Sequence, residues 1–164
     1  MESFSARRAP YAIPDEPAPT LYQRFVVTPT ATLLGVMLGG SLVGLPWMVF
    51  NGFAMGSAHR KRESVIALAT LLATGVALAL LLALNATGVI SARAFNYLGL
   101  LVHALRLAGA YVVYQSQQRS FELYLYFGGV ASNRGWLVAF LLMAARLFIA
   151  NALPSGPLSV LARF

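Results

Sequence analysis

Two arginines and a histidine stand within stretches of the chain that are otherwise almost entirely apolar. His103 and Arg106 lie in the run 95–114, and Arg146 lies in the run 136–153. A charge at the centre of a bilayer costs about 2.5–3.5 kcal/mol on insertion scales, so such a residue usually has a partner or a ligand. Arg106, Arg146 and His103 are therefore candidates for binding a partner, an anion or a lipid.

The run 95–114 and its flanks carry their polar and small residues on one side of the predicted helix. These residues fall within about 60° of His103 on a helical wheel. They are Asn96, Gly99, His103, Arg106, Ala110, Tyr114 and Gln117. The opposite side carries Leu101, Leu105, Ala108 and Val112. We expect the polar side to face the interior of a helical bundle, which adds Asn96 and Tyr114 to the binding candidates.

Several kinds of partner would compensate Arg106 and Arg146. At a rise of about 1.5 Å per residue, the two lie about 12 and 15 Å from the same membrane face. Their partners would be lipid phosphates reached by snorkelling, backbone carbonyls freed at a helix break, an anionic ligand or headgroup, or another protein's carboxylate. The last three apolar runs contain no acidic residue, so an internal ion pair requires Glu63 or Glu122 to fold inward.

The sequence lacks the residue sets of the common catalytic and metal sites. The absence of cysteine excludes disulfides, thiolate metal sites and cysteine nucleophiles. His59 and His103 are too few and too far apart for a metal site, and one membrane histidine is a poor basis for haem ligation. There is no Ser–His–acid set, phosphate-binding glycine loop or carboxylate pair. We therefore expect a non-enzymatic protein without a cofactor or a metal.

Composition indicates a membrane protein. Of the 164 residues, 59% are apolar and 10% are charged, whereas soluble domains carry about 25% charged residues. The net charge of +7 comes mainly from arginines that flank apolar runs, which is typical of topogenic signals and unlike the basic stripe of a nucleic-acid-binding protein. The sequence predicts an all-α integral membrane bundle with three or four transmembrane segments.

The chain divides into a membrane domain and two tails. A flexible, proline-rich cytoplasmic tail is predicted over 1–24 and a C-terminal tail over 154–164. The domain between them, 25–153, has apolar segments at about 28–57, 64–91, 95–114 and 136–153. A loop is expected from Gln115 to Arg134, with an interfacial aromatic stretch over 121–127.

The first apolar segment has two possible shapes. Its 34 uncharged residues, 25–58, exceed the ~20 needed for one crossing, and Gly39–Gly40, Gly44 and Pro46 interrupt them. The segment is either one long kinked helix or a re-entrant hairpin. A full crossing leaves five loop cations on each side, whereas a re-entrant hairpin places eight on the cytoplasmic side and two outside. The positive-inside rule therefore favours the hairpin with a cytoplasmic N-terminus.

Small residues recur at a spacing of four in this segment. Such spacing lets helices approach closely, either within the chain or against another chain. The glycines concerned are Gly35, Gly39, Gly40, Gly44, Gly52 and Gly56.

The order of these features is similar to that in a group of small bacterial inner-membrane proteins. The matching points are Thr28-Pro29, the run from Leu38 to Gly44, Asn51, Gly56, Gly128-Gly129 and Trp136. Ser41 stands where that group often has proline. The group has no established activity, so the resemblance implies only a multi-pass protein of a bacterial inner (cytoplasmic) membrane.

Two functional hypotheses follow. The first is partner binding within the bilayer, as an accessory subunit of a membrane complex or as an immunity protein against a membrane-acting toxin. The partner would be another membrane protein or a second copy of the chain, and not a nucleic acid. The second is a small transport or lipid- or anion-binding protein that uses Arg106, Arg146 and His103.

Overall fold

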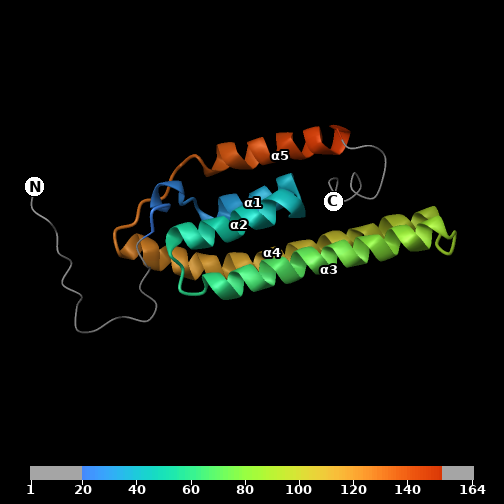
Figure 1. Ribbon diagram of the computed structural model, residues 1–164, viewed down its shortest axis with the longest axis horizontal. Coiled ribbons are helices and arrows are strands. Elements are labelled where there is room, and N and C mark those ends of the chain that lie inside the picture. Colours follow the sequence, from blue (N-terminus) through green and yellow to red (C-terminus); the bar gives the residue numbers. More distant parts are fainter. Residues whose placement is uncertain (1–19, 153–164) are drawn as a thin grey trace, which may run out of the picture.

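A computed structural model describes residues 20–152 of the chain; residues 1–19 and 153–164, which hold most of the predicted N-terminal tail and all of the predicted C-terminal tail, lie outside the described residues. Within the described part the chain is all-α and has no strands. The elements are the 3-10 helix η1 (Gln23–Phe25), α1 (Pro29–Gly39), α2 (Ser41–Met55), α3 (Arg60–Ala86), α4 (Ala92–Tyr126) and α5 (Gly135–Ala152). The long pair α3–α4 forms one layer, α1–α2 forms the next, and α5 lies outermost beside α1 (Figure 1).

The first apolar segment is a hairpin of two helices and not one kinked helix. The chain reverses at Gly40, whose φ of 78° lies in a region that only glycine adopts without strain. After the turn α2 packs back on α1 so closely that a Cβ added at Gly44 would overlap the backbone of Val36. Pro46, one of the expected interruptions, lies inside α2 and does not end it. The helix break therefore comes from glycine alone.

A buried asparagine closes the open end of this hairpin. The side chain of Asn51, near the end of α2, accepts a hydrogen bond from the Val27 N–H at 2.9 Å and donates one to the Val27 carbonyl at 3.1 Å. Val27 precedes α1, so its backbone groups have no helical partners. Asn51 thus satisfies a buried extended segment that would otherwise expose its polar groups to apolar surroundings.

Helix α3 begins and ends a few residues earlier than the predicted segment 64–91, and α4 extends beyond the predicted segment 95–114 at both ends. Residues 60–63, a mainly basic stretch between the first two predicted segments, form the first turn of α3. The prediction of a loop from Gln115 is wrong, because α4 continues to Tyr126 and the connection to α5 starts only at Phe127. The helix continues because Gln117 and Ser120 extend its buried face, and their side chains find polar partners inside the bundle. The predicted aromatic stretch is mostly the end of α4, with Phe121 and Tyr124 buried.

Helix α5 covers α1 and contacts it through small residues. Leu142 lies against Gly35 and Gly39, and Gly135 lies against Val27 and Ala31 at the start of α1. Helices α1 and α5 therefore run in the same direction from one end of the bundle. The predicted fourth segment, 136–153, agrees with α5 to within a residue at each end.

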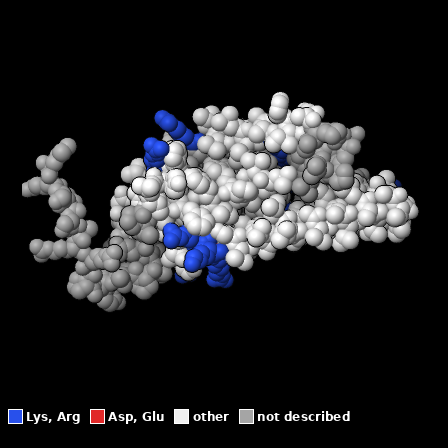
Figure 2. Space-filling model, in the orientation of Figure 1, with Lys and Arg blue, Asp and Glu red and all other residues white. Residues whose placement is uncertain are grey.

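The described cations are distributed very unevenly along the bundle. Six lie at the end where α3 begins and α4 ends, and Figure 2 shows part of this group over the start of α3. They are Arg24, Arg60, Lys61, Arg62, Arg119 and Arg134. Arg93, at the start of α4, is the one described cation at the opposite end, and Arg106 and Arg146 lie between the two ends.

Helices α3 and α4 are each long and apolar enough to cross a membrane. Only 28% of the most apolar window of each helix is buried, so most of this apolar surface faces outward. The outer side of α4 carries Leu101, Leu105 and Val112 exposed, as the helical wheel predicted. Helices α1 and α2, with 11 and 15 residues, are too short for a full crossing.

Candidate functional site

The tip of the α1–α2 hairpin brings backbone polar groups into the middle of the bundle. The Val36 carbonyl accepts from the Gly40 N–H, but the carbonyls that follow it at the end of α1 have no donor within their own helix. Arg146 of α5 donates a hydrogen bond from Nη1 to the carbonyl oxygen of Leu38 at 3.2 Å. One of the partners predicted for the interior arginines, a carbonyl freed at the helix break, is thus confirmed for Arg146.

Arg106 has a different environment. Its side chain is 4% exposed, and its Nε and Nη1 atoms have no hydrogen-bond partner among the residues that the structure describes. A buried donor of a charged group that lacks an acceptor is costly, because the group has lost its water without replacement. Arg106 is therefore the polar group of the bundle interior that most needs an acceptor.

Helix α2 begins beside this region without a cap. Its N-cap residue is Gly40, which has no side chain to accept from the first turn, and the first helical bond is donated by the Gly44 N–H to the Gly40 carbonyl. The preceding N–H groups have no acceptor within the helix. Ser41 is 5% exposed, and its buried Oγ has no partner either. The first N–H groups of α2 and the buried Ser41 hydroxyl are therefore available as hydrogen-bond donors to an anion or a polar oxygen.

A small cavity of about 20 Å³ lies at this N-terminus. It is lined by residues 39–43 together with Arg146 and Ile149. A site needs roughly 10–15 Å³ to hold one water-sized group. The cavity therefore accommodates a single small group, such as a halide ion or one oxygen atom of a larger anion.

Arg106 belongs to the same end of the hairpin. Leu45 of α2 and Ala110 of α4 share one core cluster, and later in both helices Gln117 donates to the Met48 carbonyl. Helices α2 and α4 therefore run in the same direction. Ser41 lies one turn before Leu45, and Arg106 lies one turn before Ala110. Arg106 is thus within about one helical turn of the hairpin tip. Its charge lies close enough to that of Arg146 for the two to interact.

The predicted candidates divide into two groups. His103 joins the arginine pair, because it lies within electrostatic range of both Arg106 and Arg146. Tyr114 is half-buried two turns away, where it stacks on Tyr111 with ring centroids 5.8 Å apart. Asn96 is exposed and about ten residues from Arg106, or ~15 Å along α4. The structure therefore brings together Arg106, Arg146 and His103, and it leaves Asn96 and Tyr114 outside the site.

Sequence reasoning missed a second polar cluster, centred on Glu63 in the first turn of α3. Glu63 is 1% exposed, and its Oε1 atom accepts hydrogen bonds from the hydroxyls of Ser57 and Ser116, both at 3.0 Å. Its Oε2 atom accepts from Nε2 of Gln117 at 3.3 Å. Ser57 also bonds to Ser120 at 2.9 Å. This cluster joins the α2–α3 connection to the polar half of α4.

Two features make room for the carboxylate. Gly52 faces it so closely that an added Cβ would lie 2.5 Å from Oε2. Gln117 also donates to the Met48 carbonyl at 2.7 Å and so fixes its own amide against α2. Gln117 lies about 16 Å along α4 from Arg106, so Glu63 is not the counter-charge of the interior arginines.

One signal in the sequence could have revealed the Glu63 cluster. Gln117 lay on the predicted polar stripe of the third segment, and Ser120 continues that stripe one turn later. Reading the stripe as helix beyond Tyr114 would have predicted a polar interior at this end of the bundle. No local pattern connects the stripe to Glu63, which is more than 50 positions away.

Comparison with known proteins gives no further guidance. No family model, no curated protein and no solved structure matches the chain. The resemblance to small bacterial inner-membrane proteins therefore stays a prediction.

Proposed function

We propose that this chain is a non-enzymatic, multi-pass protein of a bacterial inner membrane that binds an anionic group at the tip of the α1–α2 hairpin. The observation that carries the proposal is the buried Arg106 guanidinium, whose Nε and Nη1 have no acceptor among the described residues, within about a turn of the uncapped N-terminus of α2. The guanidinium favours negative charge, and the first N–H groups of α2 are further hydrogen-bond donors for an anion.

The membrane placement rests on surface and charge. Helices α3 and α4 are about 40 and 50 Å long, more than the ~30 Å hydrocarbon core of a bilayer, and each contains an apolar stretch long enough to cross it. Six described cations lie at the end of the bundle where α3 begins, and Arg93 is the one described cation at the other end. The positive-inside rule therefore favours a cytoplasmic location for the end where α3 begins. The hairpin then enters from the cytoplasmic side and, at about 16 Å for α1, reaches roughly mid-depth.

The environment of the hairpin tip supports this placement. Irregular backbone at membrane depth is tolerated only where protein or water satisfies it. The Leu38 carbonyl is satisfied by Arg146, and α5 covers α1 on its outer side. A re-entrant hairpin that ends helices at mid-depth is also the arrangement by which transporters present helix N-termini to anionic substrates.

An anionic ligand fits the burial of Arg106 better than the carboxylate of a partner protein. A side chain on a neighbouring helix would have to enter the bundle to reach a guanidinium that is 4% exposed. A halide, or an oxygen of a phosphate or a carboxylate, needs only the space of one water-sized group. Partner binding, the first hypothesis from sequence, is therefore the alternative that the experiment must separate.

The test compares Arg106→Gln with Arg93→Gln, an exposed arginine of the same helix. The thermal unfolding midpoint of the full chain is measured in uncharged detergent at constant ionic strength, with gluconate replaced by chloride or by inorganic phosphate. A bound anion at 100 times its Kd adds about 2.7 kcal/mol. We expect chloride or phosphate to raise the midpoint of the parent and of Arg93→Gln, and not that of Arg106→Gln.

A second variant keeps the test decisive if Arg106→Gln does not fold. Ser41→Ala removes one hydroxyl and is expected to weaken the anion about fivefold, or ~1 kcal/mol. If no anion changes the unfolding midpoint of the parent, the proposal is wrong. Loss of a co-purifying protein in Arg106→Gln, without any anion effect, favours partner binding instead. Dependence on phosphatidylglycerol but not on the free ions identifies a lipid headgroup as the source of the anion.

A further inference from the structure

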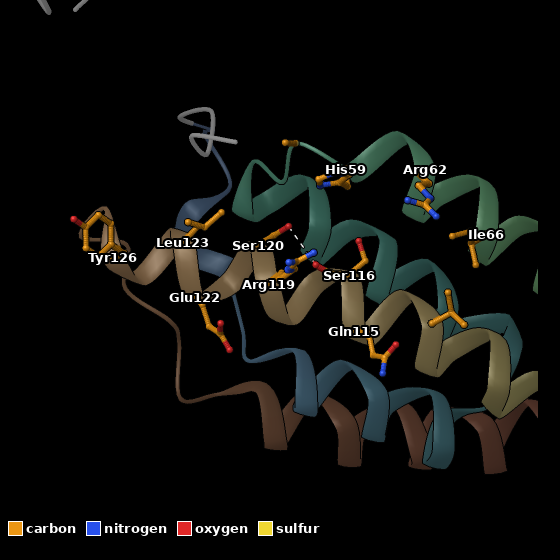
Figure 3. Close-up of a pocket in the computed structure, with 12 residues that line it drawn as sticks. His59, Arg62, Ile66, Gln115, Ser116, Arg119, Ser120, Glu122, Leu123 and Tyr126 are labelled. Atoms are coloured by element: carbon orange, nitrogen blue, oxygen red, sulfur yellow. Dashed lines mark hydrogen bonds between the residues drawn. The ribbon is translucent and has the colours of Figure 1, made fainter. Parts of the chain in front are cut away.

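We propose that the groove between α3 and α4 at the basic end of the bundle binds the headgroup of an anionic phospholipid. This proposal rests on the membrane placement argued above, but not on the anion at the hairpin tip. The groove has a volume of about 790 Å³, within the range of about 300–1,000 Å³ typical of ligand pockets. It opens to the surface, and Figure 3 shows the side chains that line it.

The charge of the groove suits an anion. Arg62 of α3 and Arg119 of α4 line it from opposite sides, and His59 lies one turn before Arg62. Both arginines are exposed, so their planar guanidinium groups are available for paired hydrogen bonds to phosphate oxygens. Glu122 is the one acidic residue of the lining, and it already accepts a hydrogen bond from Gln118 at 3.3 Å.

The groove is also amphipathic in the direction that a lipid requires. Towards the middle of the bundle its lining becomes apolar, at Ile66 on α3 and Val112 on α4. Beyond these residues the same sides of the two helices continue with exposed Ala73 and Leu80 on α3 and Leu105 on α4. A phospholipid placed here would put its phosphate beside Arg62 and Arg119 and its acyl chains along the apolar face.

The wall between the two helices is fixed in place. Ser116 and Ser120 line the groove, and both belong to the Glu63 cluster that joins α3 to α4. The two arginines therefore project from helices that are held at a set separation. Basic pockets between transmembrane helices on the cytoplasmic side are typical sites for anionic headgroups.

The test compares two double variants of the full chain that remove the same charge from the same end. Arg62→Gln/Arg119→Gln empties the groove of arginine, whereas Lys61→Gln/Arg134→Gln removes two exposed cations outside it. Lipid retained by the protein in uncharged detergent is quantified by native mass spectrometry during titration with phosphatidylglycerol and, separately, with phosphatidylcholine.

We expect the parent to prefer phosphatidylglycerol and the groove variant to bind it roughly 25-fold more weakly, at about fivefold for each arginine. The control variant should stay within about threefold of the parent. Equal losses in both variants would show a general surface effect and overturn the proposal, as would no loss in either or a parent without lipid preference. Arg106 is untouched in both variants, so the chloride and phosphate dependence of the unfolding midpoint reports separately on the hairpin tip.

Discussion

Replacement of Glu63 by alanine tests whether the buried carboxylate cluster holds α3 against α4. The carboxylate accepts three hydrogen bonds, from Ser57, Ser116 and Gln117. A hydrogen bond to a charged group contributes about 1.5–3 kcal/mol, and a donor left buried without an acceptor costs about 1–3 kcal/mol. Ser57 keeps its bond to Ser120, and Gln117 keeps its bond to the Met48 carbonyl, so only Ser116 loses its sole side-chain acceptor among the described residues. We therefore expect a loss of about 3–5 kcal/mol, below the sum of three bonds.

The unfolding midpoint in mild detergent measures this loss, with two companion variants. Glu63→Gln retains one acceptor oxygen and places an amide against the Gln117 amide, so it should cost less, about 1–2 kcal/mol. Glu122→Gln changes an exposed carboxylate that is bonded only to Gln118 among the described residues, and it should stay within about 0.5 kcal/mol of the parent. If Glu63→Ala were as mild as Glu122→Gln, the cluster would not hold the helices together.

Three further predictions concern the hairpin and its orientation. Gly44→Ala should lower the free energy of unfolding by about 1–3 kcal/mol or more, because its Cβ would meet Val36 backbone atoms. Gly75 has nothing within 4 Å of an added Cβ, so Gly75→Ala should leave that free energy unchanged or raise it by up to about 1 kcal/mol; equal effects of the two variants on the unfolding midpoint would contradict the close helix contact. Asn51→Leu should cost about 2–5 kcal/mol by leaving the Val27 N–H and carbonyl without partners, and Asn51→Asp, which keeps the acceptor, should cost less; a Leu variant as stable as the parent would refute the role of these bonds. In intact cells a membrane-impermeant maleimide should label Thr87→Cys and not Asn133→Cys, because the two exposed sites lie at opposite ends of the bundle and the chain has no cysteine of its own. Labelling of Asn133→Cys alone would show that the orientation is the opposite one.

Most of the fold was predictable because long apolar runs in the sequence are typical of membrane-spanning helices. Segment four matched α5 to within a residue at each end, segment two covered most of α3, and the exposed leucines of α4 agreed with its helical wheel. The hairpin was one of two shapes left open, since Gly40, Gly44 and Pro46 all weaken a helix locally. Only packing decides among them: Gly40 turns the chain, Gly44 lets the helices touch, and the ring of Pro46 is exposed on α2.

The sites were predictable only in part. Arg106, Arg146 and His103 were identified because charge inside an apolar run is conspicuous on its own. The Glu63 cluster was missed because a carboxylate within a basic stretch is typical of a solvated loop. Its partners Ser116 and Gln117 are more than 50 positions away, and their polarity suggested a loop where the helix in fact continues. All three residues contribute to a polar cluster inside the bundle, and that cluster forms only when the distant segments pack together in the fold.

The two interior arginines differ in the hydrogen bonds that they make with the hairpin. At the tip, the carboxyl end of α1 and the amino end of α2 meet, so their opposite partial charges, about half a charge each, largely cancel. Arg146 completes the hydrogen bonding of α1 through the Leu38 carbonyl, which is a structural role. The hairpin offers Arg106 no comparable partner among the described residues. The partial charges of the helix ends cancel, and the buried carboxylate of Glu63 lies about 16 Å away along the bundle, so neither compensates the charge of Arg106. An anion would compensate that charge, and Arg106 is the residue with donors to hold it.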